Sequence, residues 1–107
     1  MLFGNRIKEL REEQGLLQRQ LAAFLEIDTP MFSKIERGDR RAKREQVLKL
    51  AEYLHQDENE MLTLWLADKF IDAVKDEQER ELCNDAILVA QEKIKTLKKS
   101  ENLSIPD

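Results

Sequence analysis

The stretch QRQLAAFLEIDTPMFSKIER, residues 18 to 37, decides the fold, because it reads as two short helices that meet at a tight turn. The expected helices are 18–25 and 29–37, which leaves three residues for the turn. Asp28 is a favourable N-cap, since its carboxylate can accept from free backbone N–H groups at the start of the second helix. Pro30 suits the first turn of that helix, where an N–H would have no partner. The apolar residues at helical spacing are Leu21, Ala22, Leu25, Phe32 and Ile35.

The rest of the chain also reads as helical. The spacing of its apolar residues predicts helices at about 2–14, 44–55, 58–75 and 77–98. With three Gly and two Pro, the sequence offers few places where a helix would break. No segment has the polar–apolar alternation of a half-buried strand. We therefore expect an all-α chain with a five-helix domain over 1–66, a helical hairpin or extension over 67–98, and a flexible tail over 99–107.

The composition excludes several classes of protein. The chain has 107 residues, 41% of them hydrophobic and 37% charged, which suits a small soluble domain with an appendage. No run approaches the roughly 18 apolar residues of a membrane span and no signal peptide is evident, so we expect a cytoplasmic protein. One Cys and one His can form neither an internal disulfide nor a metal cluster, so no cofactor is expected. The sequence has no Ser/His/Asp set and no Gly-rich phosphate loop, which argues against an enzyme.

Charge is distributed unevenly along the chain. The net charge is −4, yet residues 1–55 carry 11 Lys and Arg against 9 Asp and Glu, whereas residues 56–107 carry 7 against 13. This asymmetry suggests different roles for the two segments. Five basic residues lie close together directly after the stretch 18–36; this basic cluster is Arg37, Arg40, Arg41, Lys43 and Arg44.

Three groups of residues form a combination that points to one family. They are Leu10, Arg11 and Gly15; Gln18, Leu21 and Ala22; and Ser33, Ile35, Glu36 and Gly38. Together with the two-helix layout, they make residues 3 to about 65 resemble the lambda-repressor/Cro-like (XRE-type) helix-turn-helix family of DNA-binding domains. The resemblance implies five helices, with 29–37 as the recognition helix in the major groove of double-stranded DNA. It also implies an ion pair between Arg11 and Glu36 that ties the first helix to the third.

The expected recognition helix carries residues suited to reading bases. Because Phe32 and Ile35 must face the core, its open face has Thr29, Pro30, Met31, Ser33 and Lys34. Lys34 can donate to guanine, and the Thr29 hydroxyl can donate or accept. The resemblance implies base contacts at Thr29, Pro30 and Lys34. The family usually has Gly at the position of Glu26 and often Gln at that of Thr29, so the operator sequence cannot be taken from a relative.

The basic cluster follows the recognition helix at the point where such domains meet the DNA backbone. Phosphate contacts supply much of the affinity for DNA, and Arg can bind a phosphate through two N–H groups. We expect two or three phosphate contacts from the cluster in each subunit. The resemblance implies a further phosphate contact at Gln18, and we include Arg19 beside it. The alternative is that the cluster is a solvated loop.

The helices expected after residue 66 carry more apolar residues than a five-helix domain needs. We expect them to form a homodimer interface through Trp65, Phe70, Leu82, Ile87 and Ile94. A dimer suits a two-fold operator with half-sites one helical turn apart. The alternative is that these helices pack within one chain.

These features predict a sequence-specific transcriptional regulator that acts as a dimeric repressor or autoregulator. A more specific form of this prediction, which the small size of the chain allows, is a regulator that controls a restriction–modification operon. The alternative from another class is an antitoxin or another protein-interaction module, with a partner protein held by the C-terminal helices. A third and less favoured hypothesis is that the helix-turn-helix fold serves only to bind protein.

Overall fold

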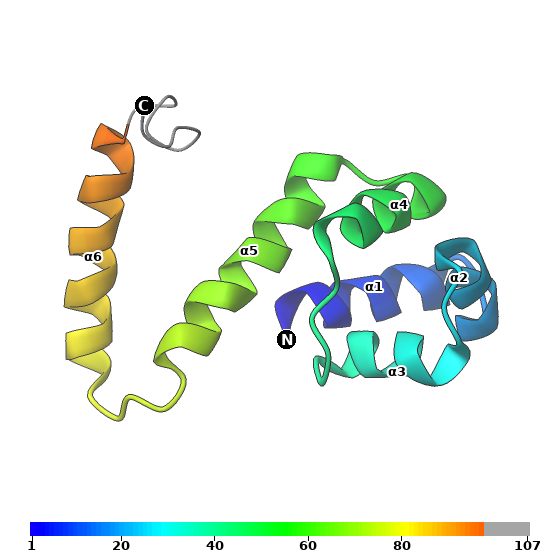
Figure 1. Ribbon diagram of the computed structural model, residues 1–107, viewed down its shortest axis with the longest axis horizontal. Coiled ribbons are helices and arrows are strands. Elements are labelled where there is room, and N and C mark those ends of the chain that lie inside the picture. Colours follow the sequence, from blue (N-terminus) through cyan, green and yellow to red (C-terminus); the bar gives the residue numbers. More distant parts are fainter. Residues whose placement is uncertain (98–107) are drawn as a thin grey trace, which may run out of the picture. The chain divides into compact units, whose positions relative to one another are not determined.

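The computed structural model describes residues 1–97, and within them the regular elements are all helices (Figure 1). In chain order they are α1 (Leu2–Glu13), α2 (Gln18–Leu25), α3 (Thr29–Arg37), α4 (Arg44–Leu54), α5 (Glu58–Val74) and α6 (Arg80–Thr96). The expected all-α class is confirmed. Helix α6 begins later than expected because Glu77 makes local bonds, with its carboxylate accepting from the N–H of Glu79. Lys98 and the expected tail of 99–107 lie outside the described residues.

The chain divides into two compact units, with the boundary after Asp72. The first unit holds α1 to α4 and α5 as far as Asp72, and the second unit holds the end of α5 and α6. Residue 66, where we expected the first domain to end, lies inside the continuous helix α5. No helix among residues 1–97 is long and apolar enough to cross a bilayer.

The core of the first unit is formed by one face of each of its helices. Helix α1 packs against α3 and α4, and α2 packs against the same two helices. The helices are amphipathic, so their polar faces remain in water while the apolar faces meet. Burial of each large apolar side chain contributes about 1.5–3 kcal/mol. The largest fully buried side chains are Ile7, Leu21, Phe32, Val47, Leu50, Leu54 and Met61.

Trp65 belongs to this core. Its side chain is 7% exposed, and its indole N–H donates to the carbonyl of Ala42 at 2.7 Å. The ammonium of Lys69 lies 4.0 Å from the ring centroid, a distance typical of a cation–π contact. Trp65, which we expected in a dimer interface, thus has both its apolar ring and its polar N–H engaged by its own chain.

The start of α1 is capped by a side chain of α5. The N-cap residue, Met1, has no side-chain bond to the helix. Instead the carboxylate of Asp68, which is 4% exposed, accepts from the N–H of Leu2 at 2.9 Å and of Phe3 at 3.0 Å. A carboxylate in this place satisfies N–H groups that have no partner in the helix and complements the positive end of the helix dipole. The contact ties α5 to the first helix.

Helix α1 also approaches the C-terminal end of α3 closely. A Cβ at Gly4 would overlap the carbonyl oxygen of Glu36 and lie 2.8 Å from that of Ile35. Glycine is therefore needed at position 4 for the two backbones to meet. In this way α1 sets the position of the end of α3, directly before the basic cluster.

Candidate nucleic-acid interface

The turn between α2 and α3 has Glu26 as its left-handed residue. This residue is the C-cap of α2 and has a left-handed backbone, with φ 59° and ψ 42°. The conformation favours glycine and costs other residues about 1–2 kcal/mol. The N–H of Ile27 donates to the carbonyl of Ala22 and closes the helix end. The turn thus has the conformation that glycine would readily give, although the sequence has glutamate.

The first turn of α3 is fixed by Asp28 and Pro30. The Oδ1 atom of Asp28 accepts from the N–H of Met31 at 2.8 Å, which confirms the expected N-cap. Pro30 lies in the first turn, where its φ already suits the helix. Both residues therefore define where α3 begins.

Helix α3 has one buried side and one accessible side. Phe32, Ile35 and Glu36 are buried. The five expected base-reading residues are all accessible: Pro30 and Lys34 are exposed, and Thr29, Met31 and Ser33 are partly exposed. An accessible helix face with hydroxyl, ammonium and apolar groups can offer donors, acceptors and methyl contacts to base edges.

A buried polar network holds α3 against α1 and α2. The guanidinium of Arg11 binds the carboxylate of Glu36 with two N–H groups, at 2.7 and 3.3 Å. The side-chain amide of Gln18 donates to the same carboxylate at 2.8 Å. Arg11 also donates to the carbonyl of Leu16 at 3.0 Å. The side chain of Glu36 is 3% exposed and that of Arg11 12%, so the network is sheltered from water.

The position of Gln18 bears on its expected role. As the first residue of α2, it lies at the helix start, where a phosphate would be attracted. Its side chain, however, points to Glu36, so any phosphate contact from this residue has to coexist with that bond. Arg19, the next residue, is exposed.

The basic cluster is exposed at all five positions. Arg37 folds back along the surface: it donates to the Ser33 hydroxyl at 2.8 Å and pairs with Asp39 at 3.0 Å. Arg41 pairs with Asp72 of α5 at 3.1 Å. The side chains of the other three cluster residues form no ion pair with any residue in 1–97; they are Arg40, Lys43 and Arg44. The cluster can therefore offer several cations to an anionic ligand.

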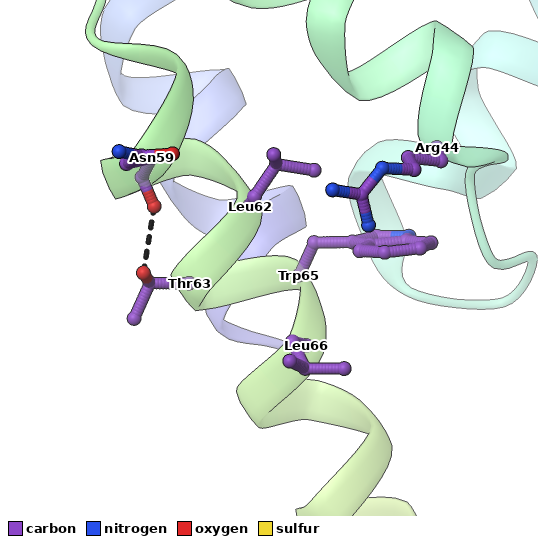
Figure 2. A pocket seen from close by; sticks show the side chains of 6 residues that line it. All are labelled: Arg44, Asn59, Leu62, Thr63, Trp65 and Leu66. Atoms are coloured by element: carbon purple, nitrogen blue, oxygen red, sulfur yellow. Dashed lines mark hydrogen bonds between the residues drawn. The ribbon is translucent and has the colours of Figure 1, made fainter. Parts of the chain in front are cut away.

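A hollow of about 210 Å³ lies beside the cluster, lined by Arg44, Asn59, Leu62, Thr63, Trp65 and Leu66 (Figure 2). In Figure 2 the guanidinium of Arg44 extends over the indole of Trp65. The Thr63 hydroxyl donates to the carbonyl of Asn59 at 2.6 Å. One cation, two uncharged polar side chains and three apolar side chains line the hollow, and they form no acid, base or nucleophile set. Within residues 1–97, no group of three or more His, Cys, Asp or Glu side chains is placed to hold a metal.

Sequence reasoning missed the contacts that α5 makes with the rest of the first unit. Neither the cap from Asp68 nor the Arg41–Asp72 pair was expected. A signal for the first did exist: α1 begins without a capping side chain of its own, and Asp68 interrupts the apolar residues of α5. No pattern in the sequence singled out Asp72.

Residues 2–64 match the profile of a family described as a helix-turn-helix domain. The match spans more than half of the chain and includes α1 to α4 with the first part of α5. No curated protein and no solved structure gives a significant match to the chain.

Proposed function

The chain belongs to the helix-turn-helix domain family, and from this premise we propose that it is a sequence-specific DNA-binding transcriptional regulator. The observation that carries the proposal is the continuity of two surfaces: the accessible side of α3 runs directly into the exposed basic cluster. Base contacts specify a DNA site, whereas phosphate contacts position the protein and supply affinity. Helix α3 and the cluster supply the groups for each.

In this proposal α3 is the recognition helix. Lys34 donates to guanine O6 or N7, and the apolar groups of Pro30 and Met31 meet thymine methyls. The Thr29 hydroxyl donates or accepts at the first turn. The Ser33 oxygen already accepts from Arg37, so its own O–H remains to be donated to a base.

The phosphates are bound in this proposal by the basic cluster, with Gln18 and Arg19 at the start of α2. Arg40, Lys43 and Arg44 are exposed and reach phosphates without breaking an ion pair to a described residue. Arg41 has to exchange Asp72 for a phosphate, and because their side chains are 35% and 40% exposed the exchange costs little. The result is a strongly salt-dependent affinity.

Two sets of variants separate base reading from phosphate binding. Lys34→Ala is expected to weaken operator binding about tenfold and binding to random DNA much less, because a base contact discriminates by about 1–3 kcal/mol.

Arg40→Ala combined with Arg41→Ala is expected to weaken binding to both kinds of DNA alike and to lower the slope of log Kobs against log salt by about 1 for each phosphate that is no longer bound. Fluorescence anisotropy with labelled duplexes, one from the region upstream of the protein's own gene and one of random sequence, measures both quantities.

The control is Lys8→Ala, which removes an exposed cation from α1. It should leave both affinities close to those of the wild type. If Lys34→Ala and the double Arg variant also bind as the wild type does, the assignment of the interface is wrong. If the wild type binds neither duplex at low salt, the proposal of a DNA-binding regulator fails.

We further propose that the regulator is a homodimer joined through its C-terminal helices. Large apolar side chains on α5 and α6 are about half exposed, including Phe70 at 46%, Leu82 at 50%, Ile87 at 46% and Ile94 at 51%. Exposed large apolar side chains can mark interaction surfaces, and each of the two helices carries some of them. Two copies of the recognition helix would then suit a two-fold operator.

Charged substitutions on α6 test the dimer. Ile87→Asp combined with Ile94→Asp is expected to convert a dimer at micromolar concentration into a monomer, since two carboxylates per chain would enter the apolar interface. Sedimentation velocity of the full-length chain measures the change. Lys93→Gln with Thr96→Asp changes the charge by the same amount at exposed positions on the other side of α6 and should leave the dimer intact. A monomeric wild type contradicts the proposal.

The regulator is proposed to act in the cytoplasm as a repressor or autoregulator, and control of a restriction–modification operon is one version. The alternative is an antitoxin or another protein-interaction module, favoured by the exposed apolar residues of α6 if these bind a partner protein instead of a second copy. Neighbouring genes discriminate between the two: a methyltransferase and an endonuclease favour the controller, and a small toxin gene favours the antitoxin. Footprinting on the upstream region identifies the operator directly.

A further inference from the structure

One face of α5 contacts the segments that border the basic cluster. Trp65, Asp68 and Asp72 follow one another at intervals of about one helical turn, so they share this face. Asp68 caps α1, while the other two contact the stretch of chain that carries the basic cluster. Trp65 donates to the carbonyl of Ala42, and Asp72 pairs with Arg41.

The segment 38–43, which joins α3 to α4, depends on such contacts because it is not helical itself. At its start, the N–H groups of Asp39 and Arg40 donate to a carbonyl of α3. At its end, the N–H of Lys43 donates to a glutamine side chain of α4 at 2.9 Å. In the middle, Ala42 is 4% exposed and its carbonyl accepts from the Trp65 indole at 2.7 Å in a buried bond. The hydrogen bond from Trp65 therefore holds the middle of the segment in place.

We propose that Trp65 is a positioning residue for phosphate binding, because it holds the segment 38–43 in the conformation that presents Arg40 and Lys43 to the DNA backbone. The inference rests on the proposed function, since it concerns the same DNA-binding surface. Trp65 acts through the segment and not by touching DNA, as its side chain is 7% exposed.

The physical reason is the cost of ordering a charged segment. Several cations bind a regular row of phosphates well only when their backbone is already in place, since ordering a flexible segment on binding costs conformational entropy. Without the indole N–H, the buried carbonyl of Ala42 has no donor, which favours conformations in which that carbonyl reaches water. The flanking cations then move away from their positions. Affinity for phosphates falls although every cation is still present.

The test is Trp65→Phe in the full-length chain, which keeps an aromatic ring and removes the N–H donor. With a labelled duplex of random sequence and with the upstream duplex, anisotropy titrations over a range of salt give the affinity and its salt slope. We expect both duplexes to bind about tenfold more weakly at 0.1 M salt, with a slope lower by about 0.9 for each phosphate that the variant fails to bind. A purely structural role for Trp65 predicts weaker folding with the same slope. The matched control is Tyr53→Phe, which removes a polar group from an aromatic ring that packs on Phe24 away from the segment.

Circular dichroism establishes that each variant is folded at the temperature of the titration. If Trp65→Phe is not folded there, Trp65→3-benzothienylalanine takes its place, since sulfur replaces the N–H and the shape of the ring is kept. A folded variant with the slope and affinities of the wild type overturns the proposal, provided that Arg40→Ala with Arg41→Ala lowers the slope. Absence of DNA binding by the wild type would instead overturn the proposed function, and this proposal with it.

Discussion

Replacement of Glu36 by alanine is expected to lower the free energy of unfolding by about 3–5 kcal/mol, since it removes one partner of a buried ion pair. The carboxylate of Glu36 is 3% exposed and accepts from Arg11 twice and from Gln18 once. After the substitution, the guanidinium of Arg11 remains largely buried without its counter-charge, and the amide of Gln18 loses its acceptor. Urea denaturation followed by the helical signal in far-ultraviolet circular dichroism measures the loss.

A double-mutant cycle separates the effect of the unpaired charge from that of the missing attraction. Arg11→Ala alone should also destabilise the fold, because Glu36 then stays buried with Gln18 as its partner. In the Glu36→Ala background, however, Arg11→Ala should cost much less than in the wild type, since no uncompensated charge is created. Glu12→Ala, an exposed carboxylate beside Arg11, is the control and should change stability by less than about 0.5 kcal/mol. A cost of under about 1 kcal/mol for Glu36→Ala would show that the network does not hold α3 in place.

The helices and the α2–turn–α3 unit could be predicted from the sequence because their signals are local. Asp28 accepts from the N–H of Met31, three residues further along the chain, and Pro30 lies in the first helical turn of α3. The spacing of Phe32 and Ile35 identifies the buried side of α3 without reference to any other helix. The helix start and the buried side of α3 were therefore predictable, because both depend on residues close together in the sequence.

The turn itself shows where a local signal was ambiguous. Glutamate seldom adopts the left-handed conformation that Glu26 has, so the residue type alone gave no indication of it. The conformation follows from the two helices that the turn has to join, because their packed apolar faces fix its end points. Packing of α2 on α3 thus overrides the backbone preference of one residue.

The partners of the α5 side chains could not be identified from the sequence, because the contacts join residues far apart in the chain. Asp68 and Leu2 are separated by 66 positions, and Trp65 and Ala42 by 23. Periodicity shows that a helix has an apolar face, but it does not show which partner that face meets. For this reason Trp65 was assigned to a dimer interface together with Phe70, although one is buried in its own domain and the other is 46% exposed.

Replacement of Asp68 by asparagine is expected to lower the free energy of unfolding by about 2–3 kcal/mol, the range typical of a lost charged hydrogen bond in a buried place. The carboxylate accepts from two N–H groups at the start of α1 with its two oxygens, Oδ1 from Leu2 and Oδ2 from Phe3. Asparagine has nearly the same shape, but only one of its two terminal atoms can accept; the other is an NH2 group that would face an N–H donor. The substitution therefore loses a charge-assisted hydrogen bond, leaves a buried donor unsatisfied and removes the negative charge from the helix N-terminus.

The same substitution at Asp28 provides a matched control, because that carboxylate caps α3 in the ordinary way. Its Oδ1 accepts from one N–H, that of Met31, and the bond is exposed to solvent. Asparagine and aspartate are about equally good at such an N-cap, so Asp28→Asn should change stability by less than about 0.5 kcal/mol. Thermal and urea unfolding of both variants give the comparison. Equal, small losses at the two sites would contradict the role of Asp68, because a cap that binds two donors in a buried place must be more sensitive to the change than an exposed one.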